Sequence, residues 1–145
     1  MSHINNLNIL RYTLKKKWWD MTFISRIKKE EYREIKPYWI SRLIDFSDVP
    51  IEQKQDLSVI ASDIIFDINN GHDPNEVIKA YHCKFKPFTH AEVKLGYARD
   101  APTGLIEIKG IRIGTAVPEW SDNWQGNVFV IEWGNVIEVK KLKQQ

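Results

Sequence analysis

The sequence contains a single cysteine, Cys83, among its 145 residues. An internal disulfide is therefore impossible, and a zinc site built from a cluster of cysteines is excluded. The uncharged stretches are too short to span a bilayer, and the N-terminus lacks the basic-then-apolar order of a secretion signal. We therefore expect a soluble protein in a reducing, cytoplasmic setting, with no membrane partner.

Several motifs that carry common enzyme chemistry are also missing. No glycine-rich loop precedes a predicted helix in the P-loop or Rossmann form, and no nucleophile-elbow sequence surrounds a serine. The histidines form no pair with metal-ligand spacing; they are His3, His72, His82 and His90. We expect neither a metal nor a cofactor, and the sequence leaves the oligomeric state open.

The composition is that of a globular protein, with 43% hydrophobic and 28% charged residues, and the length fits a single domain over 1–145. Charge is distributed unevenly behind a net value of +2. Residues 1–43 carry +6, residues 44–80 carry −6 and residues 81–145 carry +2. The basic flanks favour a phosphate-bearing partner, although solvated charged faces would give the same pattern.

Hydrophobic periodicity predicts helices between and beside several strands. Strands are expected at 7–14, 31–35, 91–97, 104–113, 127–133 and 136–139, and helices at 16–27, from Pro37, at 57–68 and at 74–81. Gly134-Asn135 is interpreted as the turn between the last two strands. Strands with glycine corners around a helical pair predict an α+β fold, a small, partly closed β-barrel decorated by helices.

The acidic middle holds the two clearest helices. Apolar residues from Leu57 to Ile68 follow the helical spacing of three and four. Asp73 is a predicted N-cap, because Pro74 suits the first helical position and Glu76 follows three residues after the cap.

The most informative stretch is the charged strand predicted at 31–35. Glu31 and Arg33 share one face of this strand, and burying them is costly unless each finds a partner or a ligand. On a concave face, such a pair could hold an anionic ligand, with Lys28 adding a cation or a base. The alternative is an exposed edge strand laced with salt bridges.

Residues 27–43 (IKKEEYREIKPYWISRL) resemble the G-x-K-x-x-E-x-R signature of the ASCH superfamily, a group of PUA-like β-barrel fold. Lys28, Glu31 and Arg33 match the lysine, glutamate and arginine, while Arg26 stands at the glycine position. A second match, to a pattern in small ASCH-like proteins of phages and bacteria, covers VKLGYARDAP, IEIKGIRIG and PEW, and VFVIEWGNVIEV resembles their closing strands. The resemblance implies a single ASCH-like domain with a helical insertion at roughly 46–85.

The resemblance implies two functions. PUA-like domains commonly bind RNA or modified nucleobases, so we expect RNA or a modified nucleoside or nucleotide in a basic and aromatic cleft. Its ligand-binding residues are expected to be Arg33, Lys36, Tyr38, Tyr97, Lys109 and Trp120. The alternative is a small hydrolase, either an amidohydrolase acting on acylated cytidine or a ribonuclease. Lys28 and Glu31 would then be catalytic, with Glu119 as a candidate second carboxylate. A plain interaction protein is a third possibility.

Overall fold

The computed structural model describes residues 8–122 and 124–141, apart from the side chains of residues 54 and 55. Its described residues form two compact units, each built from separate stretches of chain. Unit 1 lies within Met1–Glu31, Pro87–Ile111 and Ile131–Gln145, and unit 2 within Tyr32–Lys86 and Arg112–Val130. The prediction of one domain over the whole chain stays a prediction.

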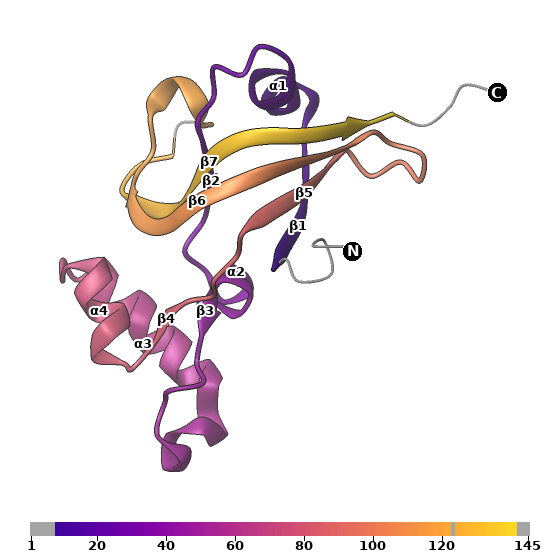
Figure 1. The fold of residues 1–145 in the computed structure, drawn as a ribbon. Coiled ribbons are helices and arrows are strands. Elements are labelled where there is room, and N and C mark those ends of the chain that lie inside the picture. The colour runs from indigo at the N-terminus through magenta and orange to yellow at the C-terminus, as the bar shows by residue number, and fades with distance from the viewer. Residues whose placement is uncertain (1–7, 123, 142–145) are drawn as a thin grey trace. The chain divides into compact units, whose positions relative to one another are not determined.

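Unit 1 is mainly β-sheet and begins with strand β1 and a short helix (Figure 1). Its elements are β1 (Ile9–Leu14), α1 (Lys16–Trp19), a π-helical turn (Asp20–Ile24), β5 (His90–Leu95) and parts of β2 (Glu30–Arg33), β6 (Thr103–Thr115) and β7 (Asn127–Lys140). The helix predicted at 16–27 therefore ends at Ile24. Ile24 and Ile27 are exposed, so neither belongs to the buried apolar face of this helix.

Unit 2 holds the other three α-helices of the described chain, together with the remaining parts of β2, β6 and β7. Its own elements are α2 (Pro37–Leu43), β3 (Ile44–Asp45), a 3-10 helix (Ile51–Asp56), α3 (Leu57–Asn69), α4 (Pro74–Ala80), β4 (Lys84–Phe85) and a 3-10 turn (Pro118–Trp120). Asp73 caps α4 as predicted, since its carboxylate accepts hydrogen bonds from the backbone N–H groups of Asn75 and Glu76.

Hydrogen bonds order the strands of the larger sheet as β1-β5-β6-β7-β2, and β3 pairs with β4 in a second, two-stranded sheet. β1 and β5 are parallel, with Leu14 opposite Leu95, whereas β5 and β6 are antiparallel. This mixture of sheet and helices confirms the α+β class. No helix in the described part of the chain is long and apolar enough to cross a membrane.

Each unit buries its own apolar side chains. In unit 1 the fully buried side chains include Leu10, Val93, Ile106 and Ile131. In unit 2, α3 buries Ile60, Ala61, Ile64 and Ile68, which confirms the predicted apolar stripe at its centre. Leu57 is exposed and Ile65 is half-buried, so the buried stripe is narrower than the apolar stripe that the sequence predicts.

The predicted turn at Gly134-Asn135 is wrong, because β7 runs without interruption from Asn127 to Lys140. Gly134 serves a close approach within the strand. A Cβ at this position would lie 3.0 Å from Cβ of Glu107, whose Oε1 accepts a hydrogen bond from the Asn135 N–H at 2.9 Å.

Candidate functional site

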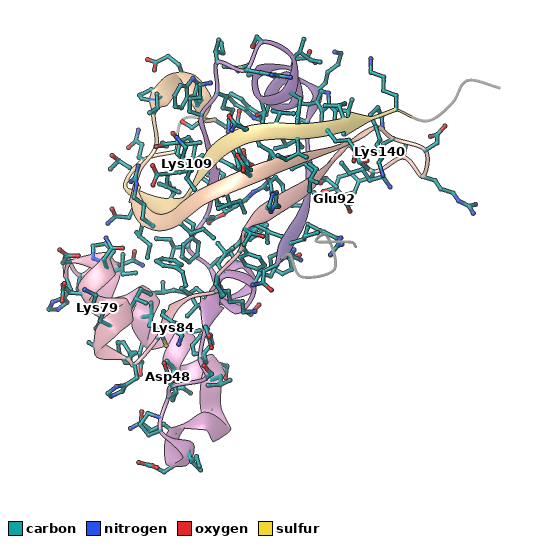
Figure 2. All side chains as sticks on the ribbon, in the orientation of Figure 1. Asp48, Lys79, Lys84, Glu92, Lys109 and Lys140 are labelled. Carbon is teal, nitrogen blue, oxygen red and sulfur yellow. The ribbon has the colours of Figure 1, made fainter. Side chains whose placement is uncertain are left out.

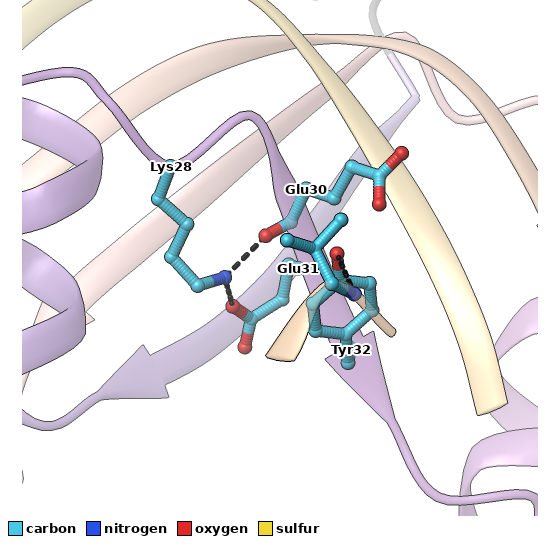
Figure 3. A network of polar contacts seen from close by, with 5 residues as sticks. Lys28, Glu30, Glu31 and Tyr32 are labelled. Carbon is cyan, nitrogen blue, oxygen red and sulfur yellow. Dashed lines mark hydrogen bonds and ion pairs between the residues drawn. The ribbon is translucent and has the colours of Figure 1, made fainter. Parts of the chain in front are cut away.

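Lys28 and Glu31 form a buried ion pair in unit 1 (Figure 3). The Lys28 Nζ lies 2.7 Å from Glu31 Oε1 and also donates to the backbone carbonyl of Glu30. Both residues are almost fully buried, Lys28 at 3% exposed and Glu31 at 5%. The two charges predicted to point into a site therefore neutralise each other inside the protein.

The local backbone carries Lys28 inward. After the π-helical turn, Arg26 adopts a left-handed conformation with φ of 61°, which is the usual way for a helix to end. The Lys28 N–H then bonds back to the carbonyl of Met21 at 3.0 Å. Its ammonium lies 5.6 Å from the ring centroid of Trp18, a cation–π contact that further offsets the loss of water.

A buried ion pair is not by itself a source of stability. Removing two charges from water costs several kcal/mol per ion, so the Coulomb attraction of such a pair often only balances the loss. Replacing a buried ion pair by apolar residues of similar volume is often neutral or stabilising. The buried position of Lys28 and Glu31 therefore does not by itself indicate that the pair stabilises the fold.

A second group of charges and rings lies in unit 2, which we call the Arg–aromatic cluster: Arg33, Tyr38, Trp39 and Arg42. The guanidinium carbons of Arg33 and Arg42 lie 5.0 and 5.3 Å from the Trp39 ring centroid. Arg42 is also 5.6 Å from the Tyr38 ring centroid and donates to Tyr38 Oη at 3.1 Å. The Tyr38 and Trp39 rings meet edge-on, with centroids 5.2 Å apart.

The helix α2 builds this cluster from a short stretch of sequence. Pro37 starts the helix, and Trp39 turns inward with Ile40 and Leu43. Tyr38 stays 56% exposed, and Arg42 reaches it one helical turn later. The exposed Tyr38 ring beside the Arg42 guanidinium offers both a stacking surface and positive charge.

Two further lysines lie near the start and the end of α2. Lys86 donates to the carbonyl of Ser41 at 3.1 Å, which places its charge at the end of the helix. Lys36 is exposed and lies 3.8 Å from the exposed carboxylate of Glu34. Exposed pairs of this kind contribute little to stability, so Lys36 can exchange its partner for a ligand at small cost.

The remaining predicted residues lie elsewhere. In unit 1, Tyr97 is 88% exposed after β5, and Lys109 is exposed on β6 (Figure 2). In unit 2, Glu119 is exposed, whereas Trp120 is half-buried against a core cluster of Tyr32, Val128 and Val130. The Val117 N–H donates to Tyr32 Oη at 3.0 Å (Figure 3), which ties this cluster to the backbone beside Trp120.

The structure thus brings together two subsets of the predicted residues. Lys28 and Glu31 meet in unit 1, whereas in unit 2 Arg33 and Tyr38 each contact Trp39 and not each other. Sequence reasoning missed Arg42 and Trp39 as site residues. The spacing of four between Tyr38 and Arg42, on a helix that Pro37 predicts, is the signal that could have found them.

In the described part of the chain, neither the cysteine nor a metal-binding cluster adds to these groups. Burial raises the pKa of the Cys83 thiol to about 11, so the thiol stays protonated at neutral pH and is a poor nucleophile. Within residues 8–122 and 124–141, no three His, Cys, Asp or Glu side chains gather in a way that could hold a metal ion.

Comparison with protein-family models, with curated proteins and with solved structures finds no match for this chain.

Proposed function

We propose that this protein binds single-stranded RNA or a modified nucleotide through the Arg–aromatic cluster. The observation that carries the proposal is the packing of Arg33 and Arg42 against Trp39 beside a Tyr38 ring that is 56% exposed. Guanidinium groups bind phosphate bidentately, and an exposed ring stacks on any base. Lys36 and Lys86 add positive charge around the same helix, which favours an anionic ligand.

We also propose that the fold is PUA-like and of the ASCH type. Arg26 occupies the position of the glycine in the ASCH signature, and its φ of 61° is the left-handed conformation that glycine adopts most readily. A sharp helix end at this position supports the alignment of Lys28, Glu31 and Arg33 with that signature.

The direct test is binding of a fluorescent single-stranded RNA, measured by anisotropy at several salt concentrations. Removing one phosphate contact weakens binding and lowers the salt dependence by about 0.7 in the log–log slope. We expect Arg42→Gln and Tyr38→Ala each to lower the affinity about fivefold or more.

Lys79→Gln is the matched control for charge, because Lys79 is an exposed cation of the same unit on α4 (Figure 2). It should bind RNA as the unmodified protein does. The proposal is wrong if binding is insensitive to salt and unchanged by Arg33→Ala and by both cluster variants.

The buried pair supports a second candidate function, a small hydrolase. Lys28 would act as a base or electrostatic stabiliser, and Glu31 would orient the substrate or the lysine. The observation that favours it is a lysine and a glutamate paired at 2.7 Å inside the protein, an arrangement that often adds little to stability. Both side chains are buried, so catalysis requires an opening that exposes them.

Turnover of acylated cytidine and cleavage of single-stranded RNA would be assayed with the unmodified protein and with a Lys28→Met, Glu31→Leu double variant. The double variant replaces both charges with apolar side chains of similar size, so the fold should be retained. We expect it to lose all turnover. Absence of turnover in the unmodified protein, or equal turnover in both, would exclude this function.

A further inference from the structure

The parallel pairing of β1 and β5 brings two separate segments to one edge of unit 1. Leu14 and Leu95 are opposite each other at the ends of the two strands. The Gly96 N–H then donates to the Leu14 carbonyl at 2.9 Å, which holds the chain after β5 beside the chain after β1. The residues directly after the two strands, Lys15 and Gly96, therefore lie close together, although about 80 positions separate them in the sequence.

The segments that follow are basic and aromatic. Three consecutive lysines, Lys15 to Lys17, come directly after β1, and Tyr97 and Arg99 come after β5. All five side chains are exposed. We call these five residues the strand-end surface.

Two acidic residues lie beside this surface. Asp20 forms an ion pair with Lys16 at 2.8 Å, and Asp100 is exposed next to Arg99. Lys17 is held by a different contact, with its ammonium 4.5 Å from the Trp18 ring centroid. Four cations against two carboxylates leave the surface with net positive charge.

Tyr97 indicates what kind of polyanion fits. Its side chain is 88% exposed, and it has no ring or hydrogen-bond partner within the described part of the chain. Both faces of the ring are therefore open. An acidic peptide would need only the charges, whereas a single-stranded nucleic acid uses the charges for its phosphates and the ring for a base.

We propose that the strand-end surface is a second contact for single-stranded nucleic acid, in which the lysines and Arg99 bind backbone phosphates and Tyr97 stacks on a base. This inference rests on the proposed function, since it assumes that the ligand is a nucleic acid. It adds a site in unit 1 to the Arg–aromatic cluster of unit 2.

The charge test uses a twelve-nucleotide single-stranded RNA and the double variant Lys15→Gln, Lys17→Gln. Its control is Lys79→Gln, Lys84→Gln, which removes the same charge at two exposed lysines of unit 2 (Figure 2). We expect the first variant to bind at least fivefold more weakly than the control at low salt. Its log–log salt slope should be smaller by about 1.4, for two phosphate contacts.

The stacking test compares Tyr97→Ala with Tyr97→Phe. The ring, and not the hydroxyl, makes the contact, so Tyr97→Ala should lose about fivefold or more in affinity while Tyr97→Phe keeps it. Because Tyr97 is almost fully exposed, neither change should disturb folding, which near-UV circular dichroism checks.

The possible failures are separable. If the unmodified protein does not bind RNA, the proposed function itself is wrong and this inference falls with it. If Arg42→Gln weakens binding but the lysine variant matches its control and Tyr97→Ala binds normally, the cluster stands and only the strand-end surface is excluded.

Discussion

At the scale of single residues, Gly104 shows how closely the core of unit 1 is packed. A Cβ added at Gly104 would lie 2.4 Å from Cε1 of the Phe23 ring. Phe23 is buried and packs on Trp19 with ring centroids 4.4 Å apart, so the ring has no free space to enter. We expect Gly104→Ala to lower the free energy of unfolding by about 1–3 kcal/mol, measured by urea denaturation.

Gly110 provides the control on the same strand. A Cβ there would meet only Glu132 Oε1, at an ordinary contact distance of 3.8 Å. Gly110→Ala should change the free energy of unfolding by less than about 0.5 kcal/mol. Equal losses in the two variants would show that steric overlap with Phe23 is not the cause.

The role of a residue was predictable only where its interaction partner lies within a few positions along the sequence. The Asp73 cap follows from its next three residues, and the prediction is confirmed. Gly134 was assigned to a turn, because the Glu107 side chain that packs closely against it is 27 positions away. Lys28 and Glu31 came from the motif, but their burial as a pair depends on packing that no local pattern encodes.

At the scale of elements, one hydrogen bond links the C-terminal end of α4 to α3. The Tyr81 hydroxyl donates to Asp67 Oδ2 at 2.6 Å, and this bond, helped by burial and by the charges of Asp67 and Asp63, raises the pKa of Tyr81 to about 12. The unfolded chain would lose this proton near pH 10. The stabilisation is therefore complete below pH 10 and is lost as the pH rises towards 12.

We expect Tyr81→Phe to be less stable than the unmodified protein by about 1 kcal/mol at pH 8. This difference in unfolding free energy should shrink as the pH rises from 10 towards 12, because the tyrosinate can no longer donate. Urea denaturation at a series of pH values measures the difference, and tyrosinate absorbance reports the pKa. Tyr97→Phe, at an exposed ring, should match the unmodified protein throughout; a Tyr81 difference that is constant with pH would contradict the assignment.

Elements were predictable where an apolar period or a cap is strong. The centre of α3 and the start of α4 follow their patterns closely. The 3-10 helix before α3, Ile51–Asp56, was not predicted, and its Ile51 side chain is exposed. An end without a matched cap has several backbone conformations of similar energy, and packing decides between them.

At the scale of the whole molecule, the sheet order was beyond what the sequence could predict. β1 pairs with β5 in parallel across a gap that contains most of unit 2. Such non-local pairing is decided by the loop-closure and packing energies of the entire chain, not by any window of it. The same pairing creates the strand-end surface, which explains why Lys15 to Lys17 carried no functional prediction.

The two units are connected by several crossings of the chain, and these connections affect how the molecule unfolds. The chain passes between them at residues 31–32, 86–87, 111–112 and 130–131, and both β6 and β7 continue from one unit into the other. Unfolding of either unit would therefore break backbone hydrogen bonds of strands that continue into the other unit.

We expect a single cooperative transition in urea, with coincident curves from tryptophan fluorescence and far-UV circular dichroism. Native-state hydrogen exchange should give the same maximal opening free energy for peptides from β1 and α3. Because each unit holds three of the six tryptophans, an independent transition of one unit would appear as a separate fluorescence step and would refute the coupling.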